Sequence, residues 1–343
     1  MDERVSATWR ARLQPFARAD PRRAGRELAS TLVPYSLGWA VQLGVAARWG
    51  RGPAMVIALL LAPLMAGLFI RLFLIEHDCG HGAFLRRRRA NLALGSLLGV
   101  LTFTPFFYWR RAHAEHHANH GNLDRRGRGD FSTWTVHEYQ AAGRLRRALY
   151  RLSRSVPLLM FVGAPFKFLV EQRIPWSMPW SWRRAWLNVL TTNLGLCALA
   201  WAAHASARLS PQLGLSTVVL LFAPKLLLGW ATAAWFLYVQ HHFEHNYWAP
   251  QRRWHFDDAA LLGSSYFDLP SWLHWFTANV GYHHVHHLSP RVPFYRLPQA
   301  HAAFATEFTA VPRFTMVSSL VCARMKLWDQ DRGRMVDFDA LER

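Results

Sequence analysis

Long apolar runs alternate with arginine-rich polar stretches along the chain. Residues 54–75 are uncharged apart from one arginine, and residues 185–203 and 224–240 are also strongly apolar. Residues 28–48 form a weaker run that contains a proline and a glutamine. Because about 20 mainly apolar residues suffice for a helix to cross a bilayer, each of these four runs is a candidate transmembrane helix.

The order of the runs and their flanking charges predict the topology. Four arginines at residues 86–89 follow the second run, and such clusters favour the cytoplasmic side. The pattern predicts an all-α integral membrane protein with four transmembrane helices in two hairpins and a helical cytoplasmic cap. Residues 1–343 are expected to form a single domain. In the second hairpin, we expect the side chain of Lys225 to extend to the outer interface.

Composition and charge agree with a membrane protein. Apolar residues make up 52% of the chain, and the net charge is +19. The arginines flank apolar runs, and no nucleic-acid-binding module is legible, so we favour membrane-related charge over nucleic-acid binding. The three cysteines are isolated, which excludes a disulfide framework and a zinc ribbon. In the basic segment 1–27, Trp9, Leu13 and Phe16 recur at helical spacing, which predicts a helix lying on the membrane surface.

Eight histidines fall into three clusters with helical spacing. Residues three or four positions apart share one face of a helix, so the imidazoles of each cluster can converge on one point. Eight imidazoles exceed what one metal ion can take, so the set implies two metals. The members are His77 and His81, then His113, His116 and His117, and last His283, His286 and His287.

The clusters constrain the topology between them. If residues 92–109 crossed the membrane, the first two clusters would lie on opposite sides and could not share metals, because ligand bonds are about 2 Å long. We therefore expect residues 92–109 to form a re-entrant or interfacial element and residues 158–170 to stay on the cytoplasmic side. All box histidines are then expected on one side of the membrane, in a common pocket.

The donor set excludes several kinds of metal site. Structural zinc sites usually include cysteines, and soluble di-iron bundles use Glu-x-x-His pairs, which this chain lacks. A zinc protease would need His-Glu-x-x-His, which is also missing. What remains is an all-nitrogen dinuclear centre at the inner face of the membrane, where an apolar chain could enter between the helices.

These clusters resemble the histidine boxes of the membrane fatty acid desaturases, in particular the bacterial acyl-lipid branch with its delta-5, delta-12 and omega-3 types. The likeness extends from about residue 50 to about residue 340. Further motifs that carry it are residues 121–127, 238–241, 243–244, 247–248, 263–265, 275–276, 279 and 326–329.

The resemblance implies a fatty acid desaturase that uses two iron ions, O2 and two electrons from a ferredoxin-like or cytochrome-b5-like donor. It implies that His241 joins the eight box histidines as a metal ligand. His120, His242 and His245 depart from the family pattern, and we interpret them as neutral variation. Carboxylates near the boxes are candidates for orienting the ligands through the second ring nitrogen: Asp78, Asp124, Asp130 and Glu244. Asn279 could hold a water at a metal, or serve as a helix cap or polar core residue.

The substrate implied is an acyl chain, expected to be lipid-linked, and the location is the bacterial cytoplasmic membrane with the site on the cytoplasmic side. A hydroxylase or ketolase acting on alkane, lipid or carotenoid could use the same centre. A membrane metal carrier is the alternative from another class, but its polar ligands should lie near the bilayer midplane. The arginines at residues 144, 146, 147, 151 and 154 could either dock an acidic electron donor or reflect the charge bias of a membrane protein.

Overall fold

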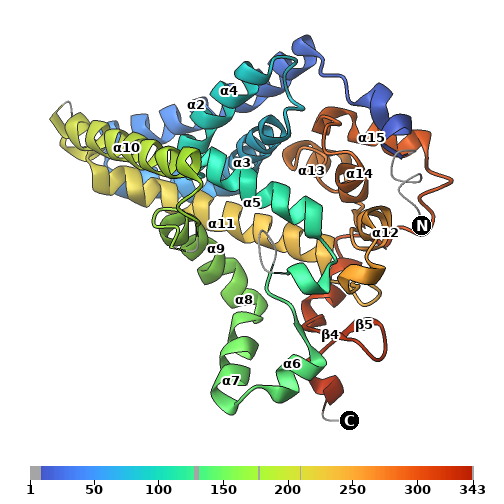
Figure 1. Cartoon of the computed structure of the whole chain (residues 1–343). Coiled ribbons are helices and arrows are strands. Elements are labelled where there is room, and N and C mark those ends of the chain that lie inside the picture. Colours follow the sequence, from blue (N-terminus) through green and yellow to red (C-terminus); the bar gives the residue numbers. More distant parts are fainter. Residues whose placement is uncertain (1–8, 127–130, 177, 209, 342–343) are drawn as a thin grey trace. The chain divides into compact units, whose positions relative to one another are not determined.

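The computed structural model describes residues 9–126, 131–176, 178–208 and 210–341 (Figure 1). The chain divides into two compact units. The first unit comprises residues 1–19, 110–159 and 234–343, and the second comprises residues 20–109 and 160–233. Most described residues are helical, which confirms a mainly helical fold, although the all-α prediction missed a few short strands.

The second unit is built on a long antiparallel helix pair, α2 (Pro21–Trp49) and α3 (Arg51–His81). Asp20 caps α2 by accepting hydrogen bonds from the backbone N–H groups of Arg22 and Arg23. Only Gly50 separates the two helices. Its φ of 86° lies in a region that glycine adopts far more readily than other residues do. The connection is therefore tighter than the apolar pattern suggested. The other helical segments of this unit are α4 (Arg88–Leu101), α9 (Ala164–Phe166) and α10 (Arg183–Ala205), with part of α5 (Phe106–Asn119) and α11 (Leu215–His241).

Among the described residues, three helical segments are long and apolar enough to cross a membrane: Arg51–His81, Arg183–Arg208 and Leu215–His241. Two sharply bent helix pairs would raise that number to five if each pair were one span. Three of the four predicted spans lie within these segments. The fourth, residues 28–48, lies inside α2 and is helical, but its crossing of the membrane stays a prediction.

The helical segment over residues 92–109 is interrupted by a sharp bend, in agreement with the prediction that these residues do not form one straight transmembrane helix. Helices α4 and α5 meet at an angle of 105°, and the backbone N–H of Thr104 donates to the carbonyl of Gly99 across the break. The hydroxyl of Thr102 donates to the buried carboxyl of Glu76 at 2.5 Å, which ties the end of α4 to α3. A single straight span over these residues is thereby excluded.

Lys225 does not reach an interface, contrary to the prediction. Its side chain is fully buried, its Nζ donates to the side-chain oxygen of Gln42 at 2.9 Å, and it lies 3.6 Å from the centre of the Trp39 ring. An aromatic face and an amide oxygen stabilise an ammonium group away from water. Gln42, which weakens the first apolar run, is therefore the polar partner of Lys225.

The first unit combines short helices with two small sheets that the apolar pattern did not predict. Strand β4 (Leu327–Asp329) pairs in parallel with β1 (Trp134–Thr135) and antiparallel with β5 (Arg334–Val336). Strands β2 (Tyr266–Phe267) and β3 (Arg313–Phe314) form a parallel pair. The helices are α6 (Val136–Ala141), α7 (Arg144–Ser153), α8 (Val156–Leu158), α12 (Phe256–Leu262), α13 (Ser271–Phe276), α14 (His283–Leu288) and α15 (Leu297–Ala303).

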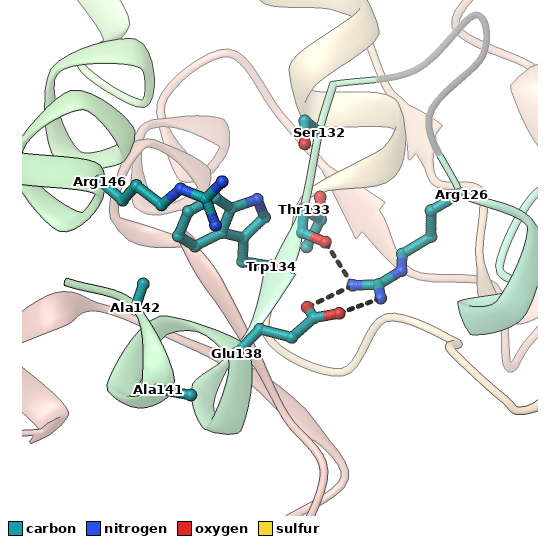
Figure 2. Close-up of a pocket in the computed structure, with 8 residues that line it drawn as sticks. All are labelled: Arg126, Ser132, Thr133, Trp134, Glu138, Ala141, Ala142 and Arg146. Atoms are coloured by element: carbon teal, nitrogen blue, oxygen red, sulfur yellow. Dashed lines mark hydrogen bonds and ion pairs between the residues drawn. The ribbon is translucent and has the colours of Figure 1, made fainter.

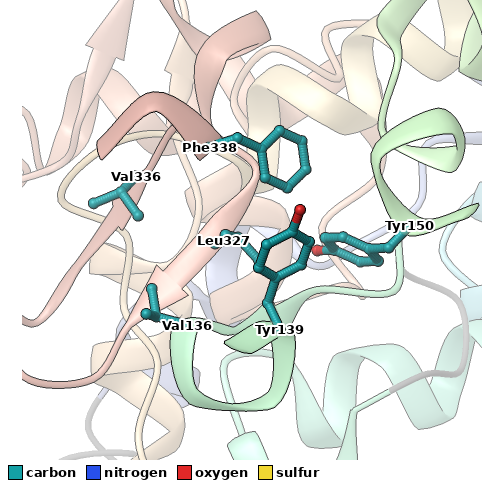
Figure 3. Close-up of a cluster of buried hydrophobic side chains, with 6 residues drawn as sticks. All are labelled: Val136, Tyr139, Tyr150, Leu327, Val336 and Phe338. Atoms are coloured by element: carbon teal, nitrogen blue, oxygen red, sulfur yellow. The ribbon is translucent and has the colours of Figure 1, made fainter. Parts of the chain in front are cut away.

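A cluster of buried side chains holds the three-stranded sheet to α6 and α7 (Figure 3). Its members are Val136, Tyr139, Tyr150, Leu327, Val336 and Phe338. The Tyr150 hydroxyl donates to the carbonyl of Lys326 at 2.7 Å and accepts from the backbone N–H of Trp134 at 2.9 Å. One tyrosine thus joins segments nearly 180 residues apart in the chain.

The N-terminal prediction was wrong where residues are described. Trp9 and Leu13 are buried within the first unit, so they do not form a surface for a membrane. The Trp9 ring stacks on Phe308 at 5.3 Å, and Arg12 forms an ion pair with Glu307. The apolar positions recur at helical spacing because they pack against residues 304–308, which the sequence pattern alone could not distinguish from a bilayer.

Candidate metal centre

The first histidine pair occupies the last turn of α3 in the second unit. His77 and His81 lie on one helical face, with ring centres 4.7 Å apart. Gly82 ends the helix in a left-handed conformation, with φ of 68°, and its N–H bonds to the carbonyl of Cys79. The predicted i, i+4 geometry is confirmed. Asp78 lies with one carboxylate oxygen 3.5 Å from Nδ1 of His77.

In the first unit, α5 and α14 bring the other two boxes together. Nε2 of His117 lies 3.0 Å from Nε2 of His113 and 3.0 Å from Nε2 of His286. These three residues form what we call the trio. Each member offers one ring nitrogen, and the three nitrogens lie within 4.8 Å of one another.

A second group, which we call the quartet, consists of His116, His241, His283 and His287, all buried in the first unit. Nε2 of His283 lies 2.9 Å from Nε2 of His241 and 3.0 Å from Nε2 of His287. The four candidate ligand nitrogens lie within 4.8 Å of one another. In the second and third boxes, the histidines at positions i and i+4 therefore belong to one group, and the histidine at position i+3 belongs to the other.

The quartet fits a metal ion. Metal–imidazole bonds of about 2.1 Å place adjacent ligands at right angles about 3.0 Å apart, which matches the two nitrogen–nitrogen distances above. Burial, followed by the neighbouring imidazoles, lowers the pKa of His287 well below its usual value. The neutral imidazole that a metal requires is thus the stable form.

A backbone carbonyl orients His241 within the quartet. Nδ1 of His241 lies 3.1 Å from the carbonyl oxygen of Gly263, so Nδ1 carries the proton and Nε2 is left to face His283. This is the arrangement that commonly fixes the tautomer of a metal-binding histidine. Nε2 of His120 lies 2.7 Å from the same oxygen, and its ring centre is 4.0 Å from that of His241.

His120 is therefore more than neutral variation. It is buried against the quartet, and a carbonyl oxygen has two lone pairs, so Gly263 can accept from both imidazoles. A Cβ at position 263 would lie 2.5 Å from the carbonyl oxygen of Ala259 and 2.8 Å from Nε2 of His120. Only glycine permits this close approach. This close packing explains why residue 263, the first position of the 263–265 motif, is a glycine.

His241 and His242 are adjacent in the sequence but contact different partners. His242 stacks on Tyr238, with ring centres 4.6 Å apart, and its Nε2 lies 3.1 Å from the Thr133 hydroxyl. His241 alone of the two belongs to the quartet. His245 is exposed and also lies outside it.

Three of the residues proposed to support the ligands have partners elsewhere in the described chain. Asp124 accepts from the backbone N–H of Gln251 at 2.8 Å, and Glu244 pairs with Arg334 at 2.7 Å. The amide of Asn279 donates to the carbonyl of Phe294 at 3.1 Å. Asp130 lies outside the described residues. For Asp78, close to His77, an orienting role stays a prediction.

One histidine pair escaped the sequence analysis. His284 is fully buried inside the third box, and its Nε2 lies 2.9 Å from Nδ1 of His301. His301 stacks on Phe308, which also contacts Trp9. His301 has no histidine three or four residues away, so spacing could not reveal a pair formed between α14 and α15.

A separate open hollow of about 510 Å³ lies beside strand β1 (Figure 2). None of its lining residues belongs to the trio or the quartet. Arg126 donates to both carboxylate oxygens of Glu138, at 2.8 and 2.5 Å. This bond is the main reason why the pKa of Glu138 falls to about 2.

Together, the apolar helices and the histidine groups define a helical membrane protein equipped to bind metal. The family model for fatty acid desaturases matches residues 53–316. The chain is 37% identical to a Bacillus subtilis fatty acid desaturase over 328 residues, which cover 95% of this chain and 89% of the relative. It belongs to the fatty acid desaturase family.

More distant relatives carry more specific names. The sn-1 oleoyl-lipid 12-desaturase of Synechocystis is 26% identical over 236 residues, covering 67% of this chain and 63% of the relative. A temperature-sensitive sn-2 acyl-lipid omega-3 desaturase (ferredoxin) of Arabidopsis thaliana is 24% identical over 252 residues, covering 68% and 53%. The chain thus spans less than two thirds of the length of these two relatives.

Proposed function

We propose that the protein is an O2-dependent desaturase that introduces a cis double bond into a lipid-linked fatty acyl chain. The observation that carries the proposal is the buried quartet of imidazoles in a chain of the desaturase family. In the balanced reaction, two adjacent methylenes lose one hydrogen each. O2 takes up these two hydrogens, two electrons and two protons and leaves as two water molecules.

We assign the quartet to one iron and the trio, completed by His77 and His81, to the other. The trio offers three nitrogens, and the pair on α3 supplies the further two that the family pattern implies. Two irons bound in this way would activate O2, the oxidant of the reaction, for attack on an unactivated carbon–hydrogen bond. Imidazole also suits zinc, copper and nickel, so iron is inferred from the family rather than from the donor set.

The protein's own residues hold the ligands in place. Gly263 fixes the proton of His241 on Nδ1, and the burial of the quartet excludes water and favours the neutral form of His287. Helices α5 and α14 each divide their box between the two groups. Both groups therefore depend on the packing of the same two helices.

The remaining assignments extend the same proposal. We infer one domain with four membrane-crossing helices in two hairpins and a cap carrying the boxes, with the site on the cytoplasmic side of a bacterial membrane. Electrons would come from a ferredoxin-like or cytochrome-b5-like protein. The name of one Arabidopsis relative includes ferredoxin, which supports the first of these donors.

The test is to express the chain in a bacterial host that lacks polyunsaturated lipids and to profile the fatty acids of each lipid class by mass spectrometry. We expect new acyl chains that have lost two hydrogens, within intact membrane lipids. His286→Ala at matched membrane levels should abolish them. Products that have gained oxygen would favour the hydroxylase alternative, and an unchanged profile with a competent electron donor present would refute the proposal.

Metal content tests the ligand assignment separately. Protein purified after anaerobic loading should contain two irons per chain by elemental analysis. His116→Ala should lose the quartet iron, whereas His242→Asn should retain both, because His242 bonds to Thr133. One zinc per chain and no iron would contradict the assignment.

A further inference from the structure

Helix α7 packs against the first unit through one face. Tyr150 is buried in the cluster of Figure 3. Arg154, directly after the helix, is also buried and bonds to the Tyr238 hydroxyl at 3.2 Å and to the carbonyl of Met325 at 3.3 Å. Arg151 donates to the Tyr139 hydroxyl at 2.6 Å. Tyr150 and Arg154 thus mark the face of α7 that packs against the first unit.

The opposite face of α7 is apolar and exposed. Leu145, Leu149 and Leu152 are 73%, 57% and 57% exposed. Their spacing of four and three residues places them in one stripe, which lies across the helix from Tyr150 and Arg154. A helix at a water-facing surface shows the reverse order, with its apolar stripe toward the core.

Arginines border this stripe. Arg144 and Arg146 are exposed and lie on its two sides, and Arg146 also reaches the rim of the hollow beside Trp134 (Figure 2). A leucine stripe between arginines is typical of helices that lie in the plane of a membrane, with the leucines among acyl chains and the guanidinium groups at lipid phosphates. The chain then continues into the apolar residues 156–170.

We propose that α7 is an in-plane membrane anchor that prefers anionic phospholipids. The inference goes beyond desaturation, because it concerns the surface on which the first unit rests and the headgroups gathered there. An acidic electron donor would match the arginines but would leave three leucines without an apolar partner. The occupant that satisfies both features is a negatively charged bilayer surface.

The experiment measures where the leucine stripe lies. In full-length protein carrying Cys197→Ser, a single cysteine replaces Leu149 and is labelled with bimane. Cys79 and Cys322 are buried and stay unlabelled. The control is Gln140→Cys, which is exposed on the neighbouring helix α6. The protein is reconstituted in phosphatidylcholine vesicles with or without phosphatidylglycerol, and the label is quenched with brominated lipid or aqueous iodide.

We expect brominated lipid to quench the label at 149 and iodide to quench the label at 140. Brominated phosphatidylglycerol should quench position 149 more than brominated phosphatidylcholine does. Arg144→Gln and Arg146→Gln should each reduce that preference about fivefold, the equivalent of about 1 kcal/mol per arginine. Iodide quenching at 149 without lipid quenching would overturn the anchor and favour a protein partner. Equal quenching by the two lipids would overturn the anionic preference.

Discussion

Replacing Gly263 with alanine tests how closely the quartet depends on one carbonyl group. The new Cβ would lie 2.5 Å from the carbonyl oxygen of Ala259 and 2.8 Å from Nε2 of His120. The first neighbour is backbone within α12 and cannot rotate away, so residue 263 must shift. The carbonyl oxygen that accepts from Nδ1 of His241 moves with it.

The magnitude follows from the role of that hydrogen bond. Loss of an orienting partner typically lowers metal affinity about 10–100-fold, which corresponds to about 1.4–2.7 kcal/mol. We expect Gly263→Ala to weaken binding at the quartet by this factor while binding at the other group stays near its original strength. The protein should then hold close to one tightly bound iron per chain under chelator competition.

The assay combines elemental analysis with the rate of iron release to a chelator. Gly143→Ala is the matched control, because a Cβ there meets no atom within 4 Å in the described structure and the residue lies in the same unit. If Gly263→Ala retains two irons and releases them at the rate of the unmodified protein, the carbonyl does not orient His241 and the reasoning fails. Equal losses in both variants would also refute it.

Three further predictions concern other parts of the chain. His286→Ala should eliminate unsaturated product at normal membrane levels whereas His242→Asn should retain most of it, as fatty-acid profiles will show. The pKa of Glu138 is depressed to about 2, so its ion pair contributes stability above its ordinary pKa of 4.5 that is lost as the pH falls toward 2. Acid unfolding of Glu138→Gln, followed by circular dichroism, should lack this component; a transition identical to that of the unmodified protein would argue against it. Gln42→Leu should lower stability by about 1–3 kcal/mol, because it removes the acceptor of a buried ammonium group, and adding Lys225→Met should restore part of the loss in thermal melts in detergent. A double variant less stable than Gln42→Leu would contradict this account.

The sequence by itself determined the features that depend on local periodicity. Histidines three and four residues apart share a helical face wherever the helix forms, and α3, α5 and α14 confirm each box. Apolar runs of sufficient length predict spanning helices, and three of the four predicted runs lie in segments that meet the length and composition of a span. The break between α4 and α5 could also be expected, because ligand distances allow no single span there.

The tertiary structure decided what depends on partners distant in the chain. Spacing cannot divide the six histidines of the second and third boxes between the trio and the quartet, since both groups combine α5 with α14. It cannot pair His284 with His301, or place Trp9 against Phe308 rather than a bilayer. Helix α7 has the same leucine spacing as a helix facing a core, and only its packed tyrosine shows that the leucines face outward. Periodicity defines the faces of a helix, whereas the rest of the chain determines what each face meets.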